Sequence, residues 1–273
     1  MAPRIQIRKA PQRWLTPAGG YLSGYSHTLN PYVGCAFGCS YCYVREMPVG
    51  RFREEAWGSW ADVKTVDEKR FRAEWKREKA KGPLLLFFGS ATDPYQTAEI
   101  RHEVTRSLLR LMAEDPPEFV LLQTRSPLVV RDTELIRLFG DRIRVSLTIE
   151  TDSEDARKHF TPAAPPLQAR WHAAEQLSAA GIPYQLAVSP LLPHTPAFAE
   201  RLAAAAGRIV VDDFFRGDGS MGKRTERLGL RASYSAFGEP ELYAPETADR
   251  FYSRLAALMP AGAVFFGQEG FRP

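Results

Sequence analysis

The chain has 273 residues, of which 44% are apolar and 25% are charged, so it holds enough apolar sequence for one large core or two modest ones. These values exclude disordered and fibrous proteins. No apolar run approaches the roughly 18 residues of a membrane helix, and residues 1–20 lack the apolar stretch of a secretion signal. We therefore expect a cytoplasmic protein with no membrane partner.

The net charge of +4, from 36 basic and 32 acidic residues, is concentrated at the start of the chain. Five basic residues precede the first acidic residue, Glu46; they are Arg4, Arg8, Lys9, Arg13 and Arg45. A basic N-terminal arm is therefore predicted over residues 1–24. Such an arm is typical of binding to nucleic acid or to an acidic partner, and equally of a solvated terminus.

Apolar strand-like runs alternate with helical patterns through the middle of the chain. A first strand closes at Tyr32 and Val33, and further strands are predicted at 84–88, 119–124, 143–149, 184–188 and 208–211. Helices are predicted at 66–79, 97–114, 134–139, 167–180 and 198–206. Strands that are apolar along most of their length and alternate with helices indicate an α/β fold with a parallel sheet or barrel. This barrel domain is expected over residues 25–215.

The last part of the chain, residues 216–273, has a different character. Residues 216–230 are rich in glycine, lysine and arginine, and one more helix is predicted at 245–258. Because this part has fewer than about 60 residues, we interpret it as a C-terminal cap or extension of the barrel and not as a separate domain.

All three cysteines, Cys35, Cys39 and Cys42, lie in one loop with the spacing C-x3-C-x2-C. Three thiolates from one loop can ligate three irons of a 4Fe-4S cluster and leave the fourth iron open for chemistry. A structural zinc site is the alternative, and it needs a fourth ligand, most simply a histidine. The histidines of the chain are His27, His102, His159, His172 and His194.

The segment from Asn30 to Tyr43, NPYVGCAFGCSYCY, resembles the signature of the radical S-adenosylmethionine (SAM) superfamily and, more narrowly, of its spore photoproduct lyase-like branch. The resemblance extends over residues 25–215. It implies a partial (β/α)6 barrel with a short C-terminal extension and with the cluster on the first loop. It also implies that SAM binds the open iron and is cleaved with an electron from a reductant such as flavodoxin or ferredoxin. The 5′-deoxyadenosyl radical then abstracts hydrogen from a substrate.

The resemblance further implies roles for residues that follow the second and third strands of the barrel. Thr92 and Asp93 are expected at the methionine part of SAM; the alternative is that Asp93 makes a turn and caps the next helix. Arg125 is expected at the SAM carboxylate, because a guanidinium can clamp a carboxylate with two hydrogen bonds.

The fourth strand and the cysteine loop supply the remaining candidates. Ser146 and Thr148 share one face of the strand and are expected near the ribose, with ordinary strand packing as the alternative. Glu150, at the end of that strand, is a further ribose or substrate candidate. The resemblance implies that one of Tyr41 and Tyr43 contacts SAM and that the other relays hydrogen, whereas most tyrosines in such loops are only packed.

One residue departs from the lyase proper. Ser90 stands where the lyase carries a cysteine hydrogen donor, and the chain has no fourth cysteine. Because a hydroxyl O–H bond is too strong to quench a carbon radical readily, this difference argues against authentic spore photoproduct repair.

The substrate therefore stays open at this point. Nucleic acid is the first expectation, from the basic arm and from a second basic group, Lys223, Arg224, Arg227 and Arg231. Asp212 and Asp213, at the end of the last strand, suit a substrate cation instead. The competing hypothesis is a nucleic-acid or protein binding module in which the cluster, or a zinc ion, has no radical chemistry.

Overall fold

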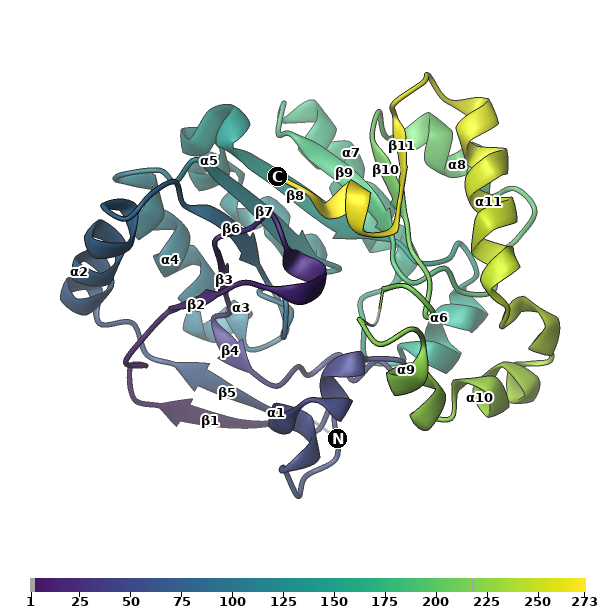
Figure 1. Ribbon diagram of the computed structural model, residues 1–273, viewed down its shortest axis with the longest axis horizontal. Coiled ribbons are helices and arrows are strands. Elements are labelled where there is room, and N and C mark those ends of the chain that lie inside the picture. Colours follow the sequence, from purple (N-terminus) through teal and green to yellow (C-terminus); the bar gives the residue numbers. More distant parts are fainter. Residues whose placement is uncertain (1–2, 218) are drawn as a thin grey trace.

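The computed structural model describes residues 3–217 and 219–273, and its centre is an eight-stranded sheet (Figure 1). The strands lie in the order β11-β10-β9-β8-β7-β6-β3-β2; neighbours from β3 to β11 are parallel, and β2 is antiparallel at the edge. Their bounds are β2 Leu15–Pro17, β3 His27–Leu29, β6 Leu85–Phe88, β7 Phe119–Thr124, β8 Ile143–Thr148, β9 Tyr184–Val188, β10 Ile209–Val211 and β11 Val264–Phe266. The six parallel strands from β3 to β10 confirm the predicted partial (β/α)6 barrel.

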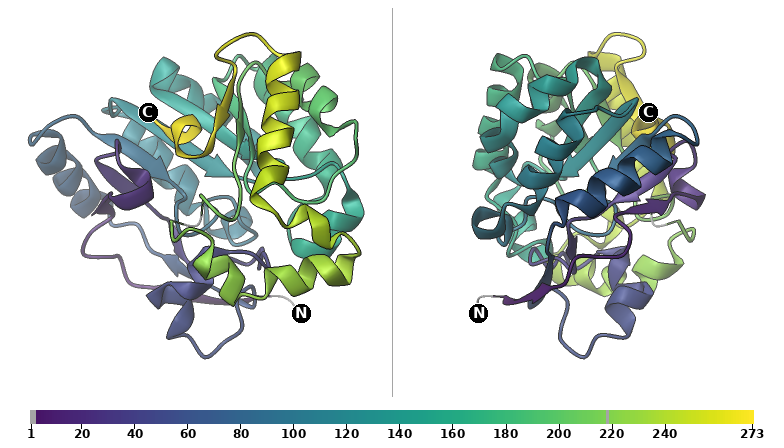
Figure 2. Two further views of the ribbon diagram at one scale, coloured as in Figure 1. Left: turned by 45° about the vertical axis from the view of Figure 1, so that its right-hand side comes forward. Right: turned by 90° about the vertical axis from the view of Figure 1, so that its left-hand side faces the viewer.

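Apolar side chains cover both faces of this sheet, which explains why the strands read as nearly continuous apolar runs. Along β7, Val120 and Leu122 enter the main core, whereas Phe119 and Leu121 belong to a cluster on the inner face of the barrel. Most of the helices that connect the strands pack over the main core (Figure 2), whereas Ala156 and Phe160 of one helix join the apolar cluster around the cysteine loop. The connecting helices are α2 Glu68–Lys79, α3 Glu99–His102, α4 Val104–Ala113, α5 Thr133–Ile136, α6 Glu154–Phe160, α7 Leu167–Ala179 and α8 Phe198–Ala205.

A second sheet of three strands lies beside the barrel, and the sequence did not indicate it. It consists of β1 (Arg4–Arg8), β5 (Trp60–Lys64) and β4 (Tyr32–Val33), with β5 in the middle. The prediction that Tyr32 and Val33 close the first barrel strand is therefore wrong. That strand is β3, and the chain leaves the main sheet at Asn30 and Pro31, because a proline has no N–H to extend the ladder.

The helix predicted over 97–114 is interrupted. Glu103 adopts a left-handed conformation, with φ at +47°, between α3 and α4. The break lets the buried carboxylate of Glu99 accept hydrogen bonds from the backbone N–H groups of Thr105, at 2.9 Å, and Arg106, at 3.1 Å. Glu99 thus satisfies the first N–H groups of α4, which have no partner within the helix.

The C-terminal part closes one side of the barrel. It contains α9 (Lys223–Arg227), α10 (Leu230–Phe237) and α11 (Pro245–Leu258), and α11 confirms the helix predicted at 245–258. β11 then pairs with β10, and the 3-10 helix η6 (Gly267–Phe271) returns toward η1 (Gly20–Leu22), where the side-chain amide of Gln268 donates to the carbonyl oxygen of Tyr21 at 2.6 Å. The remaining short helices are η2 Tyr43–Glu46, α1 Pro48–Arg51, η3 Pro127–Asp132, η4 Arg137–Arg142 and η5 Pro240–Leu242. Within the residues described, no helix has the length and apolarity needed to cross a membrane.

Candidate active site

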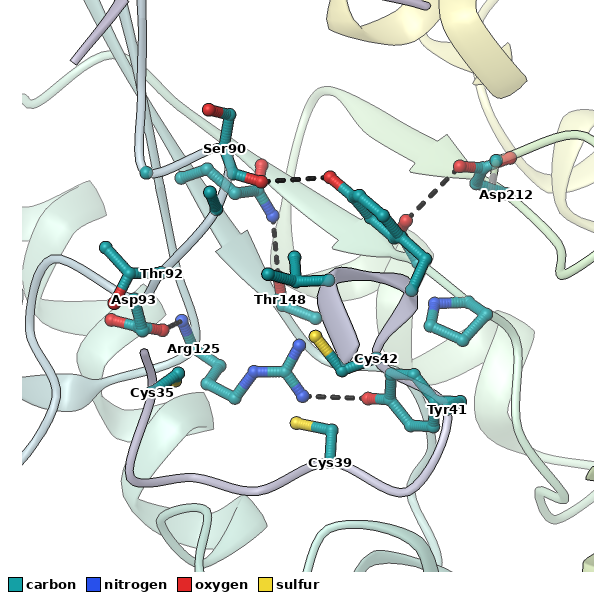
Figure 3. A pocket seen from close by; sticks show the side chains of 18 of the residues that line it. Cys35, Cys39, Tyr41, Cys42, Ser90, Thr92, Asp93, Arg125, Thr148 and Asp212 are labelled. Atoms are coloured by element: carbon teal, nitrogen blue, oxygen red, sulfur yellow. Dashed lines mark hydrogen bonds between the residues drawn. The ribbon is translucent and has the colours of Figure 1, made fainter. Parts of the chain in front are cut away.

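A pocket of about 1130 Å³, its open mouth included, lies at the carboxyl ends of the parallel strands (Figure 3). Ligands bind at this edge in parallel α/β folds. Nine of the predicted site residues line the pocket: Cys35, Cys39, Tyr41, Cys42, Tyr43, Thr92, Asp93, Arg125 and Thr148. Ser146 and Glu150 are not among its lining residues.

Two glycines shape the loop that carries the cysteines. Gly34 has φ at +79°, and a Cβ there would lie 2.3 Å from the Trp60 ring. Gly38 has φ at +58°, and a Cβ there would lie 3.0 Å from the Cα of Gly58. Glycine has no Cβ and adopts positive φ readily, so both positions require it. The loop can therefore bend sharply around the first two cysteines and pack closely against the chain near β5.

Thr92 and Gln96 hold this loop from the side of the barrel. The hydroxyl of Thr92 donates to the carbonyl oxygen of Gly34. The amide of the fully buried Gln96 donates to Gly34 O at 3.2 Å and to Thr92 Oγ1 at 2.9 Å, and it accepts from the N–H of Ala36 at 2.9 Å. No role was predicted for Gln96 from the sequence; its place in the same turn as Thr92 and Asp93 was the available signal.

The three thiols are free and face the same pocket from different sides. Burial raises the pKa of all three, that of Cys42 to about 12. A buried thiol loses its proton when a metal or another positive charge stabilises the thiolate. Among the described residues, no three histidine, cysteine, aspartate or glutamate side chains lie close enough together to bind one metal ion. None of the five histidines lines the pocket, so the histidine that a zinc site would most simply use is not there.

A buried network of charged groups lies next to Cys39. The guanidinium of Arg125 donates to the hydroxyl of Tyr41 at 2.7 Å and pairs with Glu150 at 3.1 Å. Arg170, which is fully buried, pairs with the other oxygen of Glu150 at 2.7 Å. Burial works to raise the pKa of Glu150, but Arg170 and Arg125 hold it below its usual value. Glu150 therefore stays ionised and orients Arg125 and Tyr41 from behind the pocket wall.

This network suits an anionic group in the pocket. The guanidinium of Arg125 lines the pocket, and Arg170, behind the pocket wall, shares Glu150 with it, so Glu150 does not neutralise Arg125 alone. A 4Fe-4S cluster held by three thiolates is an anion, and the carboxylate of SAM is another. The donor set and the charge around it therefore fit both groups.

Asp93 lines the pocket, but its carboxylate is bound to the chain itself. It accepts from the Thr124 hydroxyl at 2.6 Å, from the Tyr95 N–H at 2.8 Å and from the Arg125 N–H at 2.9 Å. Burial raises its pKa, while these three donors lower it. The structure thus shows the turn-forming contact that was the alternative interpretation. Asp93 also fixes the backbone of Arg125.

The two candidates on β8 differ in position. Thr148 lines the pocket, and its hydroxyl accepts from the side-chain amide of Gln123 at 2.7 Å. Ser146 is fully buried and accepts from the amide of Gln185 at 3.0 Å. Gln123, for which the sequence predicted no role, also lines the pocket, and its Oε1 is buried without a partner among the described residues. Gln123 thus offers an unused acceptor beside Thr148.

Asp212 lies in the part of the pocket farther from Arg125 (Figure 3), and Tyr43 is also one of the lining residues. The hydroxyl of Tyr43 donates to the carbonyl oxygen of Ser90 at 2.9 Å. Asp212 is 3% exposed and accepts from the hydroxyl of Tyr21 at 3.1 Å. Burial raises the pKa of Asp212 to about 7, and the neighbouring Asp213 contributes in the same direction.

Comparisons with known proteins show relatives of this chain and a solved structure of similar fold. The chain is 30% identical over 172 residues to "Uncharacterized protein MJ0683" of Methanocaldococcus jannaschii, a match that covers 63% of this chain and 62% of that protein. It is 27% identical over 196 residues to "Uncharacterized protein Rv2578c" of Mycobacterium tuberculosis, covering 68% and 55%. The chain thus matches about three fifths of the length of these relatives.

The solved structure of spore photoproduct lyase complexed with dinucleoside spore photoproduct is similar in fold. Its TM-score is 0.67 at 12% identity, and the match covers 96% of this chain and 81% of the lyase. The family model described as "Radical SAM superfamily" matches residues 29–202, which contain the cysteine loop and the strands that line the pocket. With well over half of its length matched, the chain belongs to the radical SAM superfamily.

Proposed function

We propose that this protein is a radical SAM enzyme that cleaves SAM reductively and abstracts hydrogen from a substrate bound in the same pocket. The observation that carries the proposal is the convergence of three thiols and a buried positive network on one pocket at the strand ends. When bound there, a 4Fe-4S cluster supplies the electron that splits the SAM sulfonium into methionine and a 5′-deoxyadenosyl radical. Cys35, Cys39 and Cys42 would hold three of its irons.

The residues of the chain would bind and orient SAM. Arg125, held in place by Tyr41 and Glu150, presents a guanidinium for the SAM carboxylate. Gln123 and Thr148 offer polar groups for the ribose or adenine. Asp93 acts through its hydrogen bond to the Arg125 backbone, so we assign it a positioning role.

The two tyrosines of the loop would then have different roles. Tyr41 is fixed between Arg125 and Glu150, which suits orientation of the cofactor clamp. Among the described residues, the Tyr43 hydroxyl makes one hydrogen bond, to the backbone carbonyl of Ser90, and Tyr43 lines the pocket. Of the two, Tyr43 is the candidate for hydrogen relay. An external reductant, such as flavodoxin or ferredoxin, would supply the electron, as enzymes of this superfamily generally require.

Anaerobic reconstitution followed by reduction in the presence of SAM tests the proposal. We expect about four irons and four sulfides per chain, and formation of methionine and 5′-deoxyadenosine. Single Cys35→Ala, Cys39→Ala and Cys42→Ala variants are expected to lose the intact cluster and its electron paramagnetic resonance signal. Ser40→Ala is the matched control, because Ser40 lies in the same loop and its buried hydroxyl has no partner among the described residues.

Two results would favour the competing binding module. One is a colourless protein with a single zinc ion per chain. The other is a reconstituted protein that holds its iron but neither binds nor cleaves SAM.

A further inference from the structure

The end of the pocket farther from Arg125 contains a carboxyl group that the chemistry described so far does not use. Asp212 follows β10 directly and is 3% exposed. Figure 3 shows it across the pocket from Arg125 and the cysteines. It accepts hydrogen bonds from the hydroxyls of Tyr21, at 3.1 Å, and Ser189, at 3.3 Å, and from the N–H of Asp213, at 2.9 Å. All of these donors are electrically neutral.

Among the described residues, no ion pair joins Asp212 to a cation. Arg216 interacts with it electrostatically, but this guanidinium pairs with Asp213 at 2.7 Å and with Asp249 at 3.0 Å. A second guanidinium, that of Arg224, acts on the neighbouring Tyr43 and lowers its pKa. Arg125 is the one cation among the described lining residues, and it pairs with Glu150. Asp212 thus lines the pocket with neutral hydrogen-bond donors and with no ion-pair partner among the described residues.

Aromatic rings accompany the carboxyl group. Tyr21 donates a hydrogen bond to Asp212. Burial raises the pKa of Tyr43; Cys42 and, more weakly, Asp212 act in the same direction, whereas Arg224 lowers it. Both tyrosines line the pocket. A buried carboxylate beside the faces of aromatic rings is a combination that binds cationic nitrogen groups, because the negative ring face and the carboxylate attract the same charge.

We propose that this end of the pocket receives a cationic nitrogen group of the substrate, an ammonium or an amidinium, with Asp212 as its ion-pair partner. The inference rests on the proposed function and names the substrate class for it. A phosphate group at this position would instead face the carboxyl groups of Asp212 and Asp213.

The binding has a defined pH dependence. The titratable and charged groups around Asp212 are Asp213 and Arg216 from the following loop, Tyr21 from η1, Tyr43 from η2 and, beside Tyr43, Arg224 from α9. With its pKa raised to about 7 by burial, Asp212 becomes fully charged only above neutral pH. The affinity for a cation should therefore rise as the pH increases from about 6 to about 8.

Calorimetric titration with benzamidine, a planar aromatic cation, tests the proposal on the reconstituted protein with SAM bound and no reductant. We expect benzamidine to bind and its neutral analogue benzamide to bind at least about tenfold more weakly. Asp212→Asn should weaken benzamidine binding by about ten- to a hundredfold. Asp249→Asn, an exposed partner of the same Arg216, is the control and should bind benzamidine like the wild type.

Equal affinity for benzamidine and benzamide, or an unchanged affinity in Asp212→Asn, would overturn the proposal. An equal loss of SAM affinity in Asp212→Asn would assign the carboxyl group to the cofactor instead. If the variant does not fold by circular dichroism, the wild-type pH profile decides, because a flat profile between pH 6 and 8 contradicts the role of Asp212. Benzamidine binding without any SAM cleavage would refute the proposed function alone.

Discussion

Arg125 connects the cofactor side of the pocket to the buried charges behind it. Its guanidinium is held by Tyr41 and Glu150, and its backbone N–H by Asp93. We expect Arg125→Ala to weaken SAM binding by about ten- to a hundredfold, because one charge-assisted hydrogen bond is removed. Iron content should stay intact, since Arg125 is not a cluster ligand. Calorimetry with SAM checks this, and wild-type affinity in the variant would remove Arg125 from the cofactor site.

Arg170 lies outside the pocket but holds Glu150, which in turn orients Arg125 in the pocket wall. Its pair with Glu150 has no exposed side-chain surface on either partner. Removing one partner of such a pair leaves a buried charge poorly compensated, which costs about 3 to 5 kcal/mol. We therefore expect Arg170→Gln to lower the free energy of unfolding by about that amount in urea titrations.

The pair of Arg254 and Glu200 is the matched control for this experiment, because both side chains are about half exposed. Replacing Arg254 by Ala should cost less than about 1 kcal/mol. Similar losses in the two variants would show that the buried network carries no special weight in stability.

The raised pKa of Asp212 predicts that the free energy of unfolding decreases with rising pH. An unfolded aspartate ionises near pH 3.9, whereas burial raises the pKa of Asp212 in the folded chain to about 7. Between these values the folded state binds more protons than the unfolded state, so the free energy of unfolding decreases as pH rises. The loss is on the order of 3 to 4 kcal/mol at pH 8.

Asp212→Asn removes this dependence. Compared with wild type, the variant should gain relative stability in urea titrations as the pH goes from about 4 to about 8. Because the other titrating groups are common to both proteins, the difference between them isolates residue 212. A difference that stays constant over this range would contradict the raised pKa.

The break between α3 and α4 is a strained element, since Glu103 is not a glycine and has φ at +47°. A non-glycine residue in this conformation costs about 1 kcal/mol or slightly more. We expect Glu103→Gly to stabilise the protein by up to about 1 kcal/mol, with Glu103→Ala as the control that keeps the strain. Chemical denaturation measures both. A destabilised glycine variant would show that the ion pair of Glu103 with Arg131, at 3.6 Å, outweighs the strain.

At the level of elements, the sequence was informative where the apolar pattern was long. β7, β8 and α11 were predicted almost to the residue, because each has a continuous or regularly spaced apolar run. The helix break at Glu103 was not predictable from spacing, since it depends on Glu99 capping the next helix from inside the core. β1 and β11 are short and gain their stability from distant partners, so local pattern could not show them, and Tyr32 and Val33 of β4 were predicted as strand residues but assigned to the wrong sheet.

The contrast between local pattern and distant packing also explains which residues of the candidate site could be predicted from the sequence. The cysteines and Arg125 follow strands in the sequence, and a parallel sheet brings strand ends together. By contrast, Glu150 was expected in the pocket but bonds to Arg170, a residue of α7. The pairing of a helix residue with a strand end depends on packing that no local motif encodes.

Across the whole molecule, the charge of the N-terminal segment is partly neutralised. Arg4 pairs with Glu55 at 2.7 Å and Arg8 with Asp62 at 3.0 Å, whereas Lys9 and Arg13 are exposed and form no ion pair with the described residues. If the segment binds nucleic acid, the double variant Lys9→Ala with Arg13→Ala should flatten the plot of log affinity against log salt, by roughly 0.7 to 0.9 for each phosphate that is no longer neutralised.

Point variants are the suitable test of this surface. Deleting residues 1–18 would also remove Trp14 and Leu15, which are buried in the main core. Fluorescence anisotropy with a short oligonucleotide measures the slope. An unchanged slope in the double variant would show that the segment is an edge strand with solvated charges, in agreement with a cationic and not a polyanionic substrate.

The return of η6 to η1 has a consequence for how the protein is made. Tyr21 and Phe271 both line the pocket, although 250 residues separate them (271 − 21). Contacts so distant in the sequence form late in folding, because a long loop must close before they are gained. During synthesis, the cysteine loop therefore leaves the ribosome long before the last wall of its pocket exists. Protection of the three thiols from alkylation would mark the moment at which the nascent chain becomes competent to keep a cluster.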